Sequence, residues 1–328
     1  MTDELKYMER CLQLAQCGAM GAPPNPMVGA VIVCRGRIIG EGFHRRCGGP
    51  HAEVNAIASV RQPELLAEST MYVSLEPCAH YGKTPPCADL IIAKGIPRVV
   101  IGCRDTFAKV NGLGIKKLKD AGINVTVGVL EEECRRLNRR FFTFHQKERP
   151  WVTLKWAQSA DGFIDRERSA DAAPTRISTS FTQALAHRLR ATHQAILVGT
   201  DTALLDNPTL TTRHWPGPSP LRLTIDCHHR LPQTLHLNDG SQPTHVYTTE
   251  NLHEILADLH SRGIQSLLVE GGRRLLQSFI DEGLWDEVRV ETAPMRLGRG
   301  VEAPRLEAGK LTESHLTDGQ RIDLYEHV

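Results

Sequence analysis

The 328-residue chain has almost no net charge, because 39 lysines and arginines nearly balance 38 aspartates and glutamates. It therefore lacks the broad basic field that holds a phosphate backbone or an anionic membrane, and nucleic acid is not an expected partner. It also lacks any apolar run near the ~20 residues that a membrane span requires. The opening stretch MTDELKYMERCLQLAQ is charged and amphipathic, unlike a signal peptide. We expect a soluble protein.

Disulfide staples are not expected either. Nine cysteines is an odd number, and the chain is too long to need such staples. A reducing cytoplasm fits this cysteine usage best. Six of the cysteines are interpreted as packed core residues: Cys11, Cys17, Cys34, Cys103, Cys134 and Cys227.

What the chain does have is an alternation of helix and strand patterns. An amphipathic helix follows Asp3, a plausible N-cap, and a hairpin is predicted across Arg35-Gly36. Alternating helices and strands then continue to a single long helix at 131–147. Such alternation predicts an α/β fold with helices on the faces of a sheet.

The chain is also longer than the ~100 to 200 residues typical of one domain. The helix and strand alternation restarts after the short polar stretch QKER, which Pro150 ends. We therefore predict two α/β domains, 1–147 and 148–328.

A candidate metal site lies in the first half. His51, Cys78 and Cys87 supply one imidazole and two thiols, three of the four ligands of a tetrahedral zinc site. Structural zinc sites fill all four positions with protein atoms, whereas catalytic sites keep one open, so this set predicts Zn²⁺ and hydrolysis. Each of the three residues lies at or just before a predicted helix start, where the positive helix end favours thiolate.

Glu53 lies two residues beyond His51, in the first turn of the predicted helix, and is not needed as a ligand. We predict that Glu53 is the proton shuttle of a hydrolytic deamination, taking the water proton and delivering it to the departing ammonia. The competing interpretation is a structural zinc site or a chance cluster. Four chemically matched residues in this order weigh against it.

The spacing of the two cysteines indicates the family. Deaminases of free cytidine or of nucleic acids separate them by two residues, whereas AHYGKTPP separates them here. The pattern LEPCAHYGKTPPC, with NPMVG and HAEVNA before it, resembles the bifunctional deaminase and reductase of riboflavin biosynthesis over nearly the whole chain. The resemblance implies a cytidine-deaminase-like zinc domain followed by a dihydrofolate-reductase-like domain.

The resemblance also implies how the first domain holds its substrate. His80 and Lys83 are donors suited to a base edge and a sugar phosphate, although Lys83 as an ordinary solvated lysine stays open. With Asn25, His44 and Asp105 at matching positions, they would bind a ribosylaminopyrimidine 5′-phosphate.

The second half carries a weaker pattern. Gly271 and Gly272 lie between a predicted strand and helix, where bare backbone amides could receive a cofactor phosphate; a plain turn is an equally open interpretation. A G-x-G-x-x-G motif is absent, so a Rossmann domain is not supported. Lys155 and Glu270 at strand ends are a sensible pair for polarising and protonating a sugar imine, which spacing alone cannot show.

Three motifs of this half, L-K-x-A-x-S-x-D-G, L-x-D-N-P-x-L-T-x-R and V-E-G-G, are similar to the reductase domain of the same family, which uses NADPH to reduce ribosyl to ribityl. The resemblance implies that five residues face the substrate: Lys155, Arg190, Leu210, Arg213 and Glu270. It implies that another set faces NADPH: Ala157, Thr202, Asp206, Gly271 and Gly272.

Two stretches depart from the family pattern. Residues 105–108 read DTFA where D-P-N-P is common, so a contact of the family's Asn is lost or is replaced by Asn111. Residues 174–178 read PTRIS where the family has S-x-W-I-T, so an aromatic that would cover the nicotinamide is missing. Arg176 stands in its place and could still line the cofactor.

We therefore predict a cytoplasmic, homodimeric enzyme of two domains. It deaminates a 2,5-diamino-6-(ribosylamino)pyrimidinone 5′-phosphate at zinc and then reduces the ribose with NADPH. One alternative is a zinc deaminase of another base, marked by activity without the 5′-phosphate, whose C-terminal domain is inactive or only binds a ligand. A binding protein that keeps both folds without their chemistry is a second alternative.

Overall fold

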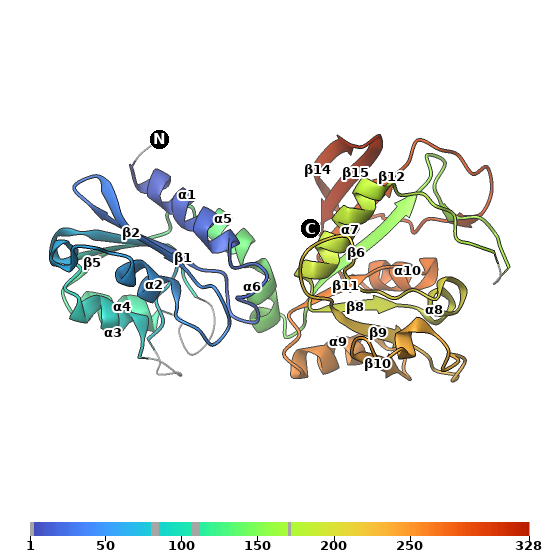
Figure 1. Cartoon of the computed structure of the whole chain (residues 1–328), viewed down its shortest axis with the longest axis horizontal. Coiled ribbons are helices and arrows are strands. Elements are labelled where there is room, and N and C mark those ends of the chain that lie inside the picture. The colour runs from blue at the N-terminus through green and yellow to red at the C-terminus, as the bar shows by residue number, and fades with distance from the viewer. Residues whose placement is uncertain (1–2, 80–84, 106–111, 170–171, 328) are drawn as a thin grey trace. The chain divides into compact units, whose positions relative to one another are not determined.

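The computed structural model describes residues 3–79, 85–105, 112–169 and 172–327. The chain divides into two compact units, Met1–Lys147 and Glu148–Val328, each built around its own sheet (Figure 1). Among the described residues, no helix combines the length and the apolar character needed to cross a bilayer.

The first unit holds a five-stranded sheet of order β2-β1-β3-β4-β5. Its strands are β1 (Gly29–Cys34), β2 (Arg37–Phe43), β3 (Thr70–Leu75), β4 (Arg98–Cys103) and β5 (Asn124–Val127). β1 is antiparallel to both of its neighbours, whereas β3, β4 and β5 are parallel. The predicted hairpin is confirmed, and its Arg35-Gly36 turn has positive φ at both residues, as a two-residue type I′ turn requires.

Helices cover both faces of this sheet (Figure 1). One face carries α2 (Ala52–Ala58), the 3₁₀ segment η1 (Pro63–Glu68), α3 (Cys87–Ala93) and α4 (Leu113–Asp120). The other carries α1 (Asp3–Gln16), α5 (Glu131–Leu137) and α6 (Arg139–Gln146). Because both faces are covered, β1, β3 and β4 are almost continuously apolar. Asp3 is the first residue of α1 and not the predicted N-cap.

The single helix predicted over 131–147 is wrong, because Asn138 divides it. This residue leaves helical geometry at φ −102° and ψ 20°, between α5 and α6. Its buried side chain accepts a hydrogen bond from the Met27 amide at 2.8 Å and donates one to the Met27 carbonyl at 2.9 Å. A contact far away in sequence therefore decides where the helix breaks.

The second unit holds an eight-stranded sheet of order β10-β9-β8-β11-β6-β12-β15-β14. The strands are β6 (Trp151–Gln158), β8 (Ala195–Val198), β9 (Leu221–Ile225), β10 (Thr244–Tyr247), β11 (Ser266–Val269), β12 (Glu287–Thr292), β14 (Lys310–Thr317) and β15 (Gln320–Glu326). The first six in spatial order are parallel, and β15 and β14 are antiparallel additions. Two short strands, β7 (Phe163–Asp165) and β13 (Val301–Glu302), pair separately.

The helices of the second unit are α7 (Ser180–Thr192), α8 (Thr200–Asp206), α9 (Leu252–Ser261) and α10 (Arg273–Asp281), with a 3₁₀ segment η2 (His236–Asn238). One face of the sheet is apolar, where α9 and α10 pack on Val152 and Leu154 of β6. The opposite face is polar under α7, where Thr182 donates to Glu291 of β12 at 2.6 Å. Lys155, between these apolar positions and the end of β6, points to the polar face because side chains alternate along a strand.

Candidate active sites

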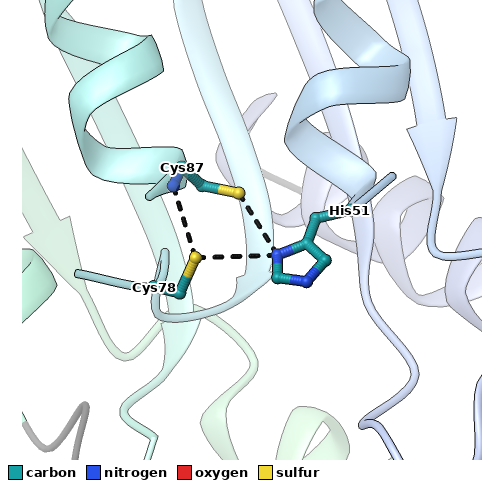
Figure 2. Close-up of side chains that lie close together, drawn as sticks. All are labelled: His51, Cys78 and Cys87. Carbon is teal, nitrogen blue, oxygen red and sulfur yellow. Dashed lines mark hydrogen bonds between the residues drawn. The ribbon is translucent and has the colours of Figure 1, made fainter. Parts of the chain in front are cut away.

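The first site is a cluster of three potential metal ligands (Figure 2). The ligand atoms of His51, Cys78 and Cys87 all lie within 4.8 Å of one another. His51 Nδ1 is 3.3 Å from Cys87 Sγ and 3.6 Å from Cys78 Sγ. A tetrahedral zinc ion with bonds of ~2.1 Å to nitrogen and ~2.3 Å to sulfur holds such atoms about 3.5 Å apart, so this donor set fits zinc.

Two of the three ligands lie at helix starts as predicted. His51 is the N-cap of α2 and Cys87 is the first residue of α3. The prediction is wrong for Cys78, which lies in the loop after β3. Its sulfur nevertheless accepts a hydrogen bond from the Cys87 amide at 3.3 Å, so it lies beside the start of α3. A hydrogen bond from the Cys87 thiol lowers the pKa of Cys78, which favours the thiolate that a metal needs.

Glu53 lies in the first turn of α2 and is 3% exposed. It is not part of the three-ligand cluster. Burial raises the pKa of its carboxyl above the ordinary value, which makes the carboxyl better able to hold a proton between the two steps of general acid and base chemistry.

The predicted substrate residues of this unit lie partly around the cluster. Asn25 Nδ2 is 3.1 Å from His44 Nε2, and His44 Nδ1 is 3.0 Å from the Pro50 carbonyl. The proton of a neutral His44 is therefore on Nδ1, and Nε2 accepts from Asn25. The His44 and His51 rings meet edge to face at 5.2 Å, so Asn25 and His44 adjoin the metal ligands.

Of the other residues predicted to bind the substrate in this unit, the structure describes Asp105. Asp105 is 6% exposed at the end of the β4 segment. His80, Lys83 and Asn111 lie outside the described residues.

Sequence reasoning missed Glu76, which is 4% exposed and lies two residues before Cys78. Its carboxylate accepts four backbone hydrogen bonds, from the amides of Asp105, Gly112, Gly114 and Ile115. It thereby ties the end of β4 and the start of α4 to the loop that carries Cys78. A signal was present, because a charged residue directly after the buried strand TMYVSL needs a buried partner.

The second site is built around an ion pair at the end of β11. Arg190 of α7 donates to both carboxylate oxygens of Glu270, at 3.1 and 2.7 Å. Burial alone would raise the pKa of Glu270, but the Arg190 guanidinium holds it below its ordinary value, so the carboxyl is ionised. Burial lowers the pKa of Lys155, which interacts with this carboxylate.

The polar face around Lys155 has unused hydrogen-bonding groups. Lys155 pairs in register with Arg289 of β12 and also interacts with Glu291. Arg289 Nη1 and Glu291 Oε2 are buried, and neither has a hydrogen-bond partner among the described residues. Buried polar atoms without partners are rare in proteins, so this face fits a polar ligand.

The predicted cofactor residues Thr202, Gly271 and Gly272 are brought together. Gly271 has φ +123° and Gly272 has φ +76° at the start of α10. A Cβ on Gly271 would meet Thr202 Cγ2 at 3.2 Å, and one on Gly272 would meet Thr202 Oγ1 at 3.1 Å. This bare backbone beside a hydroxyl is a cradle that fits a cofactor phosphate.

The remaining predicted cofactor residues have protein partners or lie on β6. Asp206, at the end of α8, forms an ion pair with Arg168. Arg176 is exposed, and its guanidinium donates to Ser180 Oγ at 3.0 Å. Ala157 pairs in register with Glu291.

The segment with the predicted substrate residues Leu210 and Arg213 follows α8. The Leu210 side chain is 2% exposed and packs in an apolar cluster, which leaves its backbone for any substrate contact. Arg213 Nη1 donates to Thr211 Oγ1 at 3.1 Å, and Arg190 Nη1 donates to the Thr211 carbonyl at 3.1 Å. Arg190 therefore joins this segment to Glu270.

Comparisons with known proteins agree with this division of chemistry. The family described as "RibD C-terminal domain" matches residues 150–322, and the family described as "Cytidine and deoxycytidylate deaminase zinc-binding region" matches residues 1–103. Riboflavin biosynthesis protein RibD of Aquifex aeolicus is 40% identical over 94% of this chain and 92% of its own length. RibD of Escherichia coli is 35% identical over 91% and 89%.

Two solved structures are similar over their full length. A diaminohydroxyphosphoribosylaminopyrimidine deaminase/5-amino-6-(5-phosphoribosylamino)uracil reductase of Thermotoga maritima is 34% identical with a TM-score of 0.90, and 99% of each chain is covered. RibD of Acinetobacter baumannii is 31% identical with a TM-score of 0.91 and the same coverage. The predicted fold class is confirmed, and the chain belongs to the RibD family of riboflavin biosynthesis proteins.

Proposed function

We propose that the two units catalyse two successive reactions. The first, in Met1–Lys147, is hydrolytic deamination of 2,5-diamino-6-(5-phosphoribosylamino)pyrimidin-4-one. The second, in Glu148–Val328, is NADPH-dependent reduction of 5-amino-6-(5-phosphoribosylamino)uracil to the ribitylamino product. Membership of the RibD family makes the chain a bifunctional deaminase and reductase that uses zinc and NADPH. The observation that carries the residue assignment is the three-ligand cluster with buried Glu53 two residues from one ligand.

In the deamination, His51, Cys78 and Cys87 would hold the zinc ion, which supplies Lewis acidity for hydrolysis. Glu53 takes one proton from the attacking water, whose oxygen bonds to the amino-bearing carbon. The same carboxyl then delivers a proton to the departing amino group, so that water and substrate become a carbonyl and ammonia. Asn25, which contacts His44, would orient the pyrimidine.

In the reduction, Thr202 and the Gly271-Gly272 cradle would hold NADPH, which supplies the hydride when bound. Glu270 is an unsuitable proton donor, because it is ionised and both of its oxygens are occupied by Arg190. Lys155 Nζ is the better donor to the sugar imine nitrogen, since a lowered pKa makes its ammonium a stronger acid. Glu270 then orients Lys155.

The experiment supplies the diaminopyrimidine phosphate to the full chain with and without NADPH and identifies the products. Wild type should form the deaminated compound without NADPH and the ribitylamino compound with it. Glu53→Gln should keep one zinc ion per chain and lose only deamination, whereas Lys155→Ala should lose only reduction. Each variant is the matched control for the other. Deamination of cytidine or guanine, or a wild type that never consumes NADPH when given the deaminated intermediate, would contradict the proposal.

We further propose that the enzyme is a cytoplasmic homodimer. All nine cysteines are free thiols, which supports a reducing compartment. The edge strand β14 exposes Leu311 by 49% and Leu316 by 76%, an apolar edge that supports self-association. Analytical ultracentrifugation of wild type and of Leu316→Lys tests the dimer; a wild-type monomer would refute it.

A further inference from the structure

His187 is a buried histidine of α7 to which the reactions above give no role. Its Nδ1 lies 2.7 Å from the Arg213 amide and 3.2 Å from the His214 amide. Both amides are donors, so Nδ1 must be the unprotonated acceptor of the ring. The geometry requires a neutral His187 with its proton on Nε2.

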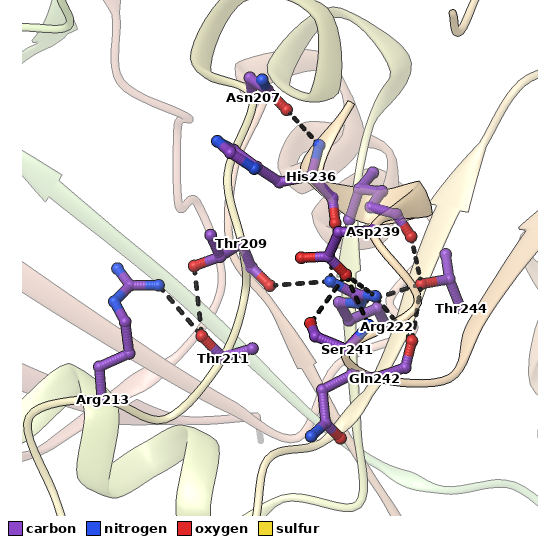
Figure 3. A network of polar contacts seen from close by, with 11 residues as sticks. Asn207, Thr209, Thr211, Arg213, Arg222, His236, Asp239, Ser241, Gln242 and Thr244 are labelled. Carbon is purple, nitrogen blue, oxygen red and sulfur yellow. Dashed lines mark hydrogen bonds and ion pairs between the residues drawn. The ribbon is translucent and has the colours of Figure 1, made fainter. Parts of the chain in front are cut away.

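These two bonds fix one end of the segment 207–214, which carries the substrate residues Leu210 and Arg213. The other end is fixed from β9 by Arg222, which is completely buried (Figure 3). Arg222 Nη1 donates to the carbonyls of Thr209 at 3.5 Å and His236 at 2.9 Å. Asn207 Oδ1 in turn accepts from the His236 amide at 2.7 Å.

Between these two anchors the segment is held less directly. Among the contacts described for it, Thr212 forms hydrogen bonds only with the loop that follows, to the Ser219 hydroxyl and the Pro218 carbonyl. Arg190 contacts the backbone one residue earlier, at the Thr211 carbonyl. His187 is therefore the side chain that ties the backbone of Arg213 itself to α7.

The charges around His187 oppose its protonation. Arg190 faces it from α7, Arg213 and His214 face it from the segment, and Glu270 faces it from the end of β11. Glu270, the one carboxylate of this group, is already paired with Arg190. Burial, followed by the charges of Arg190 and Arg213, lowers the pKa of His187 to about 4.

We propose that His187 is the positioning residue for Arg213 in the reductase site, and that its protonation releases the segment and weakens binding of the anionic substrate in acid. The proposal rests on the proposed function, because Arg213 would face the phosphorylated substrate only in that reductase, as the family resemblance implies. Arginine is suited to that task because its planar guanidinium recognises phosphate through paired donors.

The direction of the pH effect follows from linkage. Release of the segment exposes the ring and removes Arg213 and His214 from it, so the pKa of His187 rises from about 4 towards its ordinary value of about 6.5, although Arg190 of the same helix remains. Between these values the released state binds more protons, so it gains population as the pH falls. The KM of the reduction should therefore rise as the pH falls from about 6.5, with little change in kcat.

The test compares His187→Leu, which removes the acceptor, with His187→Asn, whose side-chain oxygen replaces Nδ1 and does not titrate. Reduction of the deaminated intermediate is measured at saturating NADPH, near pH 7.5 and near pH 5. Amide hydrogen exchange at Arg213 and His214 reports release of the segment without substrate. His253→Leu, which changes an exposed histidine of α9, is the matched control.

We expect His187→Leu to raise KM about ten-fold near pH 7.5, as loss of one or two hydrogen bonds implies, and to speed exchange at the two amides. Near pH 5 the difference in KM from wild type should shrink, because protonation of His187 releases the segment in wild type as well. His187→Asn should keep a near-wild-type KM near pH 7.5 and lose the acid-dependent rise. Because the substrate phosphate titrates equally in both proteins, this difference isolates His187. Unchanged exchange in His187→Leu would show that His187 does not hold the segment against α7. Faster exchange with an unchanged KM would show that His187 does not position Arg213 for the substrate. If wild type reduces nothing, the proposed function fails, while the exchange result still decides whether His187 holds the segment.

Discussion

Replacing Glu76 with glutamine tests whether one buried carboxylate holds the loop next to the metal ligands. Oε2 accepts from Asp105 and Gly112 at 3.3 and 3.0 Å, and Oε1 accepts from Gly114 and Ile115 at 3.0 and 3.2 Å. A glutamine keeps one acceptor and turns an NH₂ group towards the other two amides. Two charge-assisted hydrogen bonds are lost, and two buried donors are left without a partner.

A hydrogen bond to a charged group contributes about 1.5 to 3 kcal/mol, so two lost bonds predict a destabilisation of about 3 to 6 kcal/mol. The loop has little room to relax, because a Cβ on Gly114 would already lie 2.0 Å from the Pro77 carbonyl oxygen. Native domains are stable by only about 5 to 15 kcal/mol, so the change is large enough to endanger the first unit.

The two units can be followed separately in one urea titration. All four tryptophans, Trp151, Trp156, Trp215 and Trp285, belong to the second unit, so their fluorescence reports that unit alone. Release of zinc to a chelator reports the first unit. Far-UV circular dichroism reports both units, so a transition that it shows and tryptophan fluorescence does not belongs to the first unit. Glu76→Gln should shift the first transition and leave the tryptophan transition unchanged.

Glu68→Gln is the matched control. Its carboxylate forms an exposed ion pair with Arg35, which predicts little change in the free energy of unfolding. If Glu76→Gln lowers the free energy of unfolding of the first unit by no more than this control, the carboxylate does not hold the loop and the reasoning is refuted.

Two further substitutions test other parts of the structure. Gly272→Ala should weaken NADPH binding at least about five-fold, because the backbone at this position has positive φ and the added Cβ would meet Thr202 Oγ1. Fluorescence titration gives the Kd. An unchanged Kd would show that the Gly271-Gly272 backbone does not hold the cofactor. Asn138→Ala should destabilise the first unit by about 2 kcal/mol through two lost bonds to Met27, with the exposed Asn124→Ala as control; equal unfolding midpoints for the two variants would contradict this account of the helix break.

The sequence predicted those features of the first unit that depend on neighbouring residues. The apolar runs of β1, β3 and β4 and the hairpin at Arg35-Gly36 are local patterns, and the structure has them where the patterns lie. The position of two metal ligands was predictable from local sequence as well, because His51 and Cys87 lie at helix starts. The role of Glu76 could not be predicted from neighbouring residues, because its four donors follow β4, about 30 to 40 residues later in the sequence. Cys17 was interpreted as a core residue and is exposed, since α1 turns it to solvent beyond its last turn.

In the second unit, the sequence prediction left out α8, β14 and β15, and the first two of these have weak patterns. β14 is exposed along nearly its whole length, so its sequence KLTESHLT shows no apolar alternation. α8 has seven residues and one buried side chain, Ala203, too little for a helical period to appear. Both elements are stabilised by neighbours, β14 by its antiparallel pairing with β15 and α8 by the packing of Ala203 in an apolar cluster.

The strand β12 shows why the reductase site could not be derived from pattern alone. Its sequence EVRVET alternates charged and apolar residues, which ordinarily predicts one face on the core and one in water. Here Arg289 is 6% exposed and Glu291 is fully buried, because α7 covers that face and Thr182 bonds to Glu291. One buried polar atom without a partner costs about 1 to 3 kcal/mol, and Arg289 Nη1 and Glu291 Oε2 are two such atoms in the described part of the chain. Apolar residues in place of Arg289 and Glu291 would remove this cost, as the apolar residues on the opposite face of β12 do. The cost is offset if a polar ligand beside Lys155 supplies the missing hydrogen bonds, and the same atoms then account for both the lower stability of this face and its ability to bind.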